Sequence, residues 1–242
     1  MNRQNNSSDK TFANWTEDDL IFTFGLKRLN KCGLLENWME AESIFSDFEE
    51  AYLKKFRTHA EQNITAWNEA ELRAKLIDPI TMLVNFDDNK YLLTAFSERN
   101  MYAVSGKTVL KGKVDWVVAT GKNNPREPFF FIHEYKKESG GSEEPLAQLL
   151  AAMLAAQQLH KTPPVSNLLI PKPIHYYKDI PIYGCYIIGR SWFFVTLDAK
   201  EYCVSNAFNA TEKKDLYKIV SLLKAQKKQI LKMLDKYIGK LA

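Results

Sequence analysis

Apolar residues recur at helical spacing over roughly the first third of the chain, after a polar start rich in Asn and Ser. Residues 1–12 are predicted to form a disordered tail, because such a composition offers little apolar surface to bury. The predicted helical segments are one after Thr16, one at Leu34–Met39, one from Ser43 and a longer one over Ile64–Phe86. Pro79 falls inside the last segment and is expected to kink it. Residues 13–62 are therefore expected to be an all-helical extension.

The pattern changes from helices to strands after the turn signal Asp87-Asp88-Asn89. Three apolar runs of strand length follow one another, at Tyr91–Phe96, Thr108–Ala119 and Phe129–Lys136. Gly112 interrupts the second run and is expected to mark a bulge or bend. Three strands in succession predict an antiparallel meander.

Helices and strands are mixed in the remainder of the chain. An alanine-rich helix is predicted from Pro145 to about His160, and its small side chains would let it approach a sheet closely. Two strands at Ile182–Ile188 and Ser191–Leu197 are predicted to form a tight hairpin, and a lysine-rich amphipathic helix follows from Thr211. The order of elements favours a mixed α/β core over a regular alternation of parallel units.

Composition narrows the class of protein without naming its partner. The chain has 242 residues, 45% apolar and 26% charged, which is enough for one sizeable core. It has no apolar run long enough to span a bilayer and a polar start, so we expect a soluble, cytoplasmic protein with no membrane partner. Its three cysteines lack metal-site spacing and are expected to be reduced and structural. The net charge of +4 is compatible with a polyanionic partner.

Three charged residues stand where buried strands are predicted. Asp115 is the only polar residue of Val114–Ala119, and burying a carboxylate is costly unless it is paired or bound to a metal. With a side-chain period of two, Glu134 and Lys136 share a strand face with Phe130 and Ile132. Two converging acids favour a hard cation such as Mg²⁺ between them. The simpler alternatives are a strand-entry cap at Asp115 and a surface ion pair between Glu134 and Lys136.

The order of these residues resembles the core motif of a known nuclease superfamily. Asp115, a spacer of strand-turn-strand length and then Glu134-x-Lys136 are similar to the motif of the PD-(D/E)XK nucleases. Further segments resemble that superfamily in the same order: the acid-bearing helix Asn68–Pro79, the glycine-led strand Gly112–Asp115, the glutamine-bearing helix Gln148–Met153 and the hairpin Tyr183–Val195. The resemblance covers about residues 68–197. It departs from the family pattern at Val114, which replaces a proline, and at Ala152, where RecB-like members carry a tyrosine.

The resemblance implies both a fold and an activity. The fold would be restriction-endonuclease-like, with the order α-β-β-β-α-β-β over residues 63–205. Residues 206–242, the lysine-rich amphipathic helix predicted from its pattern, lie outside the resemblance. The activity would be metal-dependent hydrolysis of nucleic acid, DNA rather than RNA, with Mg²⁺, or Mn²⁺ as a substitute, and with a homodimer as one arrangement.

The resemblance also assigns roles to individual residues. Asp115 and Glu134 would hold the metal ion and Lys136 would position the attacking water. Glu69 would complete the acidic site, in preference to Glu71, because residues two apart on a helix do not share a face. Gln148 would join the site from the following helix.

Two other readings remain open at the level of sequence. One is a catalytically inactive nuclease-fold module that binds nucleic acid or protein. The other is an ordinary α/β interaction protein in which Asp115 and Glu134 never meet. Outside the motif, His133 is expected on the opposite sheet face as a satisfied or partly exposed structural histidine, and Phe193 is expected in the core. The C-terminal lysines are expected to be solvated or, given a nuclease, to follow phosphates.

Overall fold

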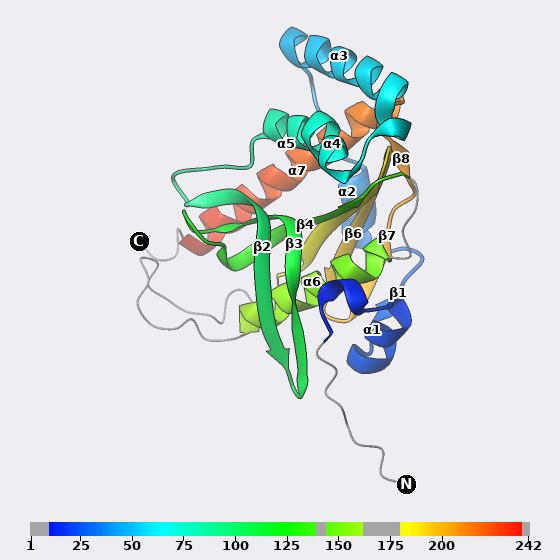
Figure 1. Cartoon of the computed structure of the whole chain (residues 1–242). Coiled ribbons are helices and arrows are strands. Elements are labelled where there is room, and N and C mark those ends of the chain that lie inside the picture. The colour runs from blue at the N-terminus through cyan, green and yellow to red at the C-terminus, as the bar shows by residue number, and fades with distance from the viewer. Residues whose placement is uncertain (1–9, 139–143, 162–179, 239–242) are drawn as a thin grey trace.

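The structure, a computed structural model, describes residues 10–138, 144–161 and 180–238 (Figure 1). Within these ranges, the strands are β1 (Lys27–Arg28), β2 (Leu93–Ser105), β3 (Thr108–Thr120), β4 (Arg126–Lys136), β5 (Ile182–Ile188), β6 (Ser191–Asp198), β7 (Glu201–Val204) and β8 (Phe208–Asn209). The helices are η1 (Phe12–Asn14), α1 (Glu17–Phe24), α2 (Gly33–Met39), α3 (Asp47–Asn63), η2 (Ile64–Ala66), α4 (Glu69–Leu72), η3 (Arg73–Ile77), α5 (Asp78–Val84), α6 (Pro145–Lys161) and α7 (Lys213–Ile238).

The strands form one mixed sheet in the order β1-β7-β6-β5-β4-β3-β2, with β8 beside β6. The antiparallel meander is confirmed, because β2 pairs antiparallel with β3 and β3 with β4. The β5–β6 hairpin is confirmed as well, and Gly189 in its turn has a φ of 55°, a conformation that favours glycine. The α6 connection brings β5 parallel to β4, which makes the sheet mixed and confirms the α/β class.

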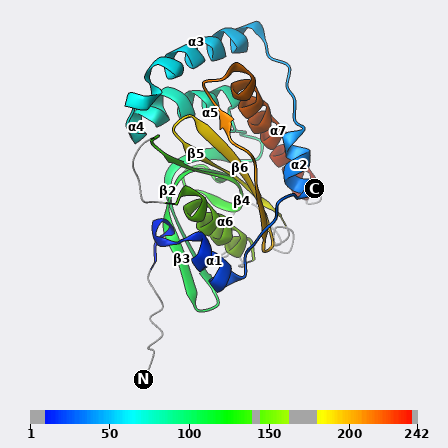
Figure 2. The same cartoon turned by 90° about the vertical axis from the view of Figure 1, so that its right-hand side faces the viewer.

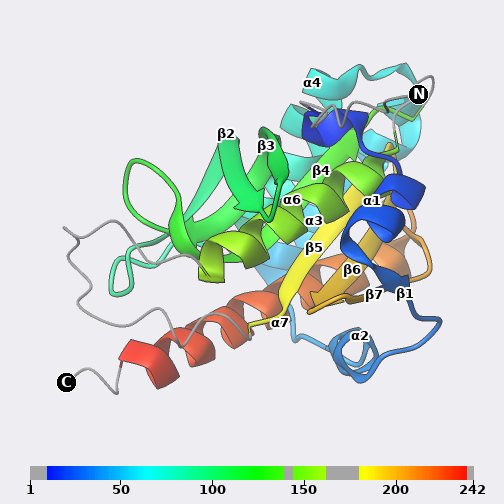
Figure 3. The same ribbon diagram turned by 90° about the horizontal axis from the view of Figure 1, so that it is seen from below.

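Helices cover both faces of the sheet. In Figures 2 and 3, α1 and α6 lie on one side of β5 and β6, and α2 and α7 lie on the other. We call these the α6 face and the α7 face. The α6 face is packed with Val117, Ile132, Ile182 and Val195, among others. The α7 face is packed with Trp116, Phe131, Trp192 and Phe194 and continues into α3, α4 and α5. No helix in the described ranges is both long and apolar enough to cross a membrane.

The expectation of an all-helical first segment is wrong in one place. Lys27 and Arg28 form β1, which pairs in parallel with Glu201 and Tyr202 of β7. Residues this polar carry no strand signal of their own, so the pairing comes from the exposed edge that β7 offers. The helix predicted after Thr16 is confirmed as α1, and Thr16 caps it by accepting from the backbone N–H of Asp19 at 3.1 Å.

The helix predicted over Ile64–Phe86 is divided. η2 ends at Ala66, and α4, η3 and α5 then run consecutively from Glu69 to Val84. η3 is π-helical, with the backbone N–H of Asp78 bonded to the carbonyl of Arg73. Pro79 lacks an N–H and clashes with the preceding turn, so the wider π turn accommodates it where a kink was expected.

Gly112 does not mark a bulge. It pairs regularly with Met101, and a Cβ built on it would lie 2.5 Å from Cδ2 of Phe12. Glycine is therefore needed at this position so that the buried ring of Phe12 can lie against β3. Phe12 belongs to the segment predicted as a tail, whose first nine residues lie outside the described residues.

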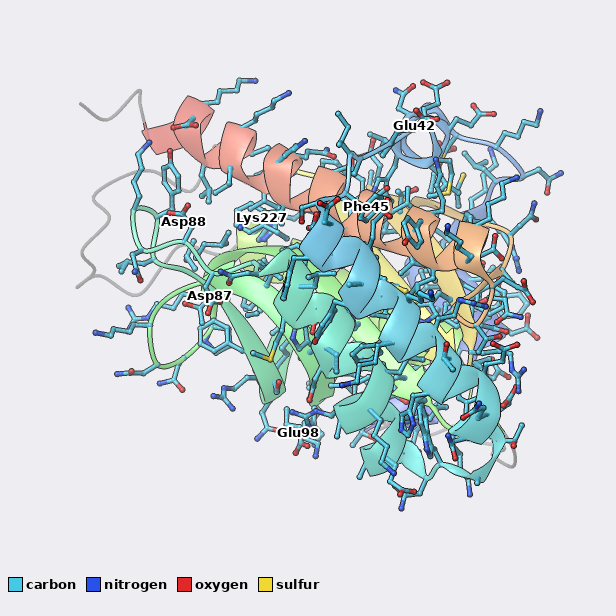
Figure 4. The ribbon with its side chains drawn as sticks, turned by 90° about the horizontal axis from the view of Figure 1, so that it is seen from above. Glu42, Phe45, Asp87, Asp88, Glu98 and Lys227 are labelled. Carbon is cyan, nitrogen blue, oxygen red and sulfur yellow. The ribbon has the colours of Figure 1, made fainter. Side chains whose placement is uncertain are left out.

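Several α7 lysines make contacts within the protein. Nζ of Lys218 donates to the carbonyl of Ala41 at 2.8 Å, and Lys224 pairs with Glu49 of α3. Lys227 donates to the carbonyl of Asn85, and Figure 4 shows it beside the segment that carries Asp87. These contacts fasten α3 and the end of α5 to α7, so these three lysines have structural partners.

Candidate active site

Asp115 and Glu134 lie next to each other on adjacent strands. The pairing of β3 with β4 begins at Trp116↔His133, and Asp115 and Glu134 are the next residues of the two strands. Glu134 lies on the α6 face, because the adjacent Tyr135 packs on the α7 face, and its carboxyl group interacts with that of Asp115. The two acids therefore meet, and their binding of a shared metal ion stays a prediction.

Asp115 occupies the point where β3 and β4 separate. Beyond Trp116↔His133, the backbone N–H of Tyr135 donates to Oδ2 of Asp115 at 3.0 Å. A buried backbone donor needs a partner, and here the Asp115 carboxylate accepts the hydrogen bond that a backbone carbonyl of β3 would accept if the pairing continued. The alternative of a cap at the entry to the strand is thus replaced by a bond to the neighbouring strand.

Glu134 is buried and carries an ion pair. Its side chain is 3% exposed, and its Oε1 lies 3.0 Å from Nζ of Lys136, whose side chain is 21% exposed. The contact lacks hydrogen-bond geometry, because Oε1 has no hydrogen-bond partner among the described residues. This is not a surface ion pair, since both groups are largely withdrawn from water.

Burial raises the pKa values of both acids, and the charge of Asp115 raises the pKa of Glu134 further. Burial is the main cause at Asp115, opposed by the hydrogen bond from Tyr135. The pKa of Glu134 is raised well above its usual value by burial and then by the charge of Asp115, while Lys136 opposes the rise. A buried pair of like charges therefore favours a shared proton or a cation between the carboxyl groups.

One detail of the face assignment is corrected. The register of β3 and β4 shifts between Val118 and Ala119, so that Phe130 is an extra residue in a bulge. Phe130 packs on the α7 face, whereas Phe129 and Ile132 pack on the α6 face with the acids. Glu134 thus shares its face with Ile132 but not with Phe130.

Gln148 lies near the same end of β4. The backbone N–H of Phe129 donates to Nε2 of His160 at 2.8 Å, which joins the end of α6 to the early part of β4. Gln148 precedes His160 by twelve residues, which is about 18 Å along a helix. Glu134 follows Phe129 by five residues, which is about 17 Å along a strand. The two distances are similar, so Gln148 lies near the level of Glu134. Gln148 is 8% exposed, and its Oε1 has no hydrogen-bond partner among the described residues.

Glu69 lies on a helix that packs on the α7 face. It is the first residue of α4, whose Leu72 packs on the α7 face. Glu71 is committed locally, because it completes the capping box with Asn68 and pairs with Lys75 at 2.7 Å. The role of Glu69 as a ligand stays a prediction.

Sequence reasoning missed a strained residue beside Asp115. Glu98 of β2 has a φ of 52° and lies between the pairs Ser97↔Trp116 and Arg99↔Val114, hence opposite Asp115. Its carboxylate pairs with Arg73 at 2.8 Å and with Lys113 at 3.1 Å, below the α4–α5 helices in Figure 4. Such a backbone conformation costs energy in a non-glycine residue, and nothing in a strand sequence announces it.

The donor set suits a hard divalent cation. The two carboxylates supply only oxygen, and one buried oxygen of Glu134 has no hydrogen bond to a described residue. Within the described ranges, no group of three or more acids, histidines or cysteines is arranged to hold a metal. An ion here would therefore depend on Asp115 and Glu134, with backbone, water or substrate oxygens completing its shell.

His133 lies on the α7 face as expected, but it is neither satisfied nor partly exposed. The side chain is fully buried, and neither ring nitrogen has a hydrogen-bond partner in the described part of the chain. The ring stacks on that of Trp116 with 4.4 Å between the ring centroids. Burial lowers the pKa of His133 to about 3. His133 is a neutral core residue with no catalytic position.

Comparison with known proteins adds no further assignment. No family model matches the chain, and a search of curated proteins finds no match. The resemblance to the PD-(D/E)XK nucleases therefore rests on the motif residues and on the geometry described above.

Proposed function

We propose that the protein is a metal-dependent nuclease that hydrolyses phosphodiester bonds in nucleic acid, DNA rather than RNA by resemblance. The observation that carries the proposal is the meeting of two buried carboxylates from adjacent strands, with Nζ of Lys136 3.0 Å from Glu134. An ordinary interaction protein has no reason to bury such a group, because the desolvation of charges is costly. The proposal depends on the site and not on the fold, which could serve many functions.

Each residue has a separate task in the proposed reaction. Asp115 and Glu134 would hold Mg²⁺, or Mn²⁺ in its place, and the N–H of Tyr135 would keep the Asp115 carboxylate oriented. When bound, the ion would polarise the phosphate and lower the pKa of a water molecule. Lys136 would orient the attacking water and offset the negative charge that develops on the phosphate. Glu69 and Gln148 would complete the site from α4 and α6.

The test is cleavage of labelled single- and double-stranded DNA and RNA with Mg²⁺ or Mn²⁺. Asp115→Asn, Glu134→Gln and Lys136→Ala are each expected to lower the rate at least about a hundredfold, the usual effect of removing a group that stabilises developing charge. Lys137→Ala is the matched control, because Lys137 is the adjacent, exposed lysine. Comparing Glu69→Gln with Glu71→Gln shows which acid serves the site.

Metal binding supplies a second measurement that does not require turnover. Mg²⁺ should raise the melting temperature of the unmodified protein and leave Asp115→Asn/Glu134→Gln unchanged, since a ligand stabilises the state that binds it. Cleavage retained in that double variant would contradict the proposal. Metal binding without cleavage of any nucleic acid would instead favour the inactive binding module.

A further inference from the structure

Two aromatic residues continue the line of the acids across the sheet. Glu134 pairs with Tyr186 of β5, and Tyr186 pairs with Phe193 of β6. Paired residues point to the same face, so Glu134, Tyr186 and Phe193 form one row on the α6 face, and the carboxyl group of Asp115 lies beside that of Glu134. Because neighbouring strands are about 4.8 Å apart, Tyr186 lies one spacing from Glu134 and Phe193 lies two.

The two rings are parallel and incompletely covered. Their centroids are 4.5 Å apart and their planes differ by 5°, and both residues are intermediate in exposure. Gly184 precedes Tyr186 by two residues and lies on the same face of β5. There α6 packs tightly on the strand, since a Cβ on Gly184 would lie 3.1 Å from side-chain atoms of Leu149 and Met153. The cover therefore thins from Gly184 to Tyr186. Phe193 was expected in the core and is only partly buried.

A cross-strand aromatic pair can serve the sheet alone, so its surroundings decide what else it does. A charged group of each sign lies close to Tyr186: Arg28 of β1 lowers the pKa of its hydroxyl and Glu17 raises it. Burial is the larger effect and raises the pKa of Tyr186 to about 12, so the ring stays neutral. Arg28 is half exposed and pairs with Glu17 at 3.5 Å on the β6 side of the rings, and Lys136 pairs with Glu134 at 3.0 Å on the β4 side.

We propose that Tyr186 and Phe193 form a stacking platform for an unpaired nucleobase next to the bond that is cut. The inference rests on the proposed nuclease function and names its substrate class: a single strand, an overhang or a frayed end in preference to an intact duplex. Every base has a π face that an aromatic side chain can stack on, whereas bases inside a duplex are already stacked. A base held one or two β-strand spacings from Glu134 would place the phosphates of its nucleic-acid strand beside the acids. Arg28 and Lys136 would then lie near the sugar-phosphate backbone.

The test is equilibrium binding of a single-stranded oligonucleotide containing the fluorescent base 2-aminopurine, with a chelator present to prevent cleavage. Stacking on the rings should quench the fluorescence. Tyr186→Leu and Phe193→Leu should each weaken binding about 5- to 150-fold, which corresponds to the 1–3 kcal/mol of one stacked base. Tyr186→Phe keeps the ring and should bind like the unmodified protein. Tyr102→Leu is the matched control, because Tyr102 is 60% exposed on the β2–β3 hairpin.

An abasic site scanned along the oligonucleotide separates stacking from general damage to the fold. The unmodified protein should lose affinity at one position of the abasic site, and Tyr186→Leu should lose nothing further there, because the two changes remove the same contact. Independent losses would overturn the inference, as would equal binding by all variants, even if the unmodified protein cleaves DNA. If quenching depends on Tyr186 and no variant cleaves anything, the platform stands and the nuclease proposal fails. If the unmodified protein binds no oligonucleotide, the platform is wrong.

Discussion

His133 and Glu134 are consecutive on β4 and equally hidden from water, but they enter opposite faces of the sheet. Burial favours the neutral form of each, lowering the pKa of the histidine and raising that of the acid. On the α7 face His133 packs against aromatic rings such as those of Trp116 and Phe131. On the α6 face Glu134 meets the carboxyl group of Asp115 and the ammonium group of Lys136. Burial thus produces an inert residue on one face and a poised acid on the other, according to the neighbours.

The two faces also differ in how completely they are covered. The α7 face is closed by α7 and by the helices at the end of the sheet, and Trp192 and Phe194 on it are fully buried. On the α6 face, cover is tight at Gly184 and incomplete at Tyr186. Stability is therefore expected to depend most on the α7 face and chemistry on the α6 face. Three experiments test this division.

The largest effect should follow truncation of an aromatic side chain on the α7 face. Trp116 is 5% exposed and packs edge-on against Phe86 at 5.3 Å, so Trp116→Ala should cost about 3–5 kcal/mol of unfolding free energy. Phe193→Ala on the α6 face should cost about 1–2 kcal/mol, because that ring is already partly in water. Urea unfolding measures both values. Equal losses would show that the faces do not differ in packing.

A smaller effect on stability is expected from the titration of His133, and its pH dependence is opposite to that of Glu134 on the other face. Its folded pKa of about 3 lies below the unfolded value of 6.5, so the unfolded state takes up the proton first as the pH falls. The stability that the neutral ring contributes is complete above pH 6.5 and is lost progressively toward pH 3. His133→Met should remove this loss, worth about 2–3 kcal/mol between pH 7 and 4.5 at about 1.4 kcal/mol per unit. Parallel pH profiles for the two proteins would show that His133 does not titrate in this way.

The smallest effect should come from neutralising Glu134. Its folded pKa is raised, so the unfolded carboxyl ionises first as the pH rises past about 4.5, and the native state loses stability above that pH. Glu134→Gln should therefore stabilise the metal-free protein at pH 8 and leave its stability almost unchanged at pH 4. Thermal unfolding in a chelator measures the difference. A variant less stable than the unmodified protein at pH 8 would mean that the ion pair with Lys136 outweighs burial and repulsion.

Local pattern predicted much of the fold because it depends on neighbouring residues. The strand runs, the turn at Gly189 and the α6 start at Pro145 all follow from side-chain period and from backbone preferences. The bulge at Phe130 and the left-handed backbone of Glu98 were not predictable, because each conformation depends on pairing with another strand and not on the local sequence. β1 is a similar case, because an open strand edge recruits it.

The sequence by itself determined which residues could do chemistry: two acids and a lysine at the ends of apolar strands, where unpaired charge is too costly to be incidental. Only the tertiary structure decided which residues lie next to them. The pairing of β3 with β4 brought Asp115 beside Glu134, and the β4–β5 and β5–β6 registers placed Tyr186 and Phe193 in one row with Glu134. Register depends on how distant segments pair, and a shift of one residue would send every side chain to the other face.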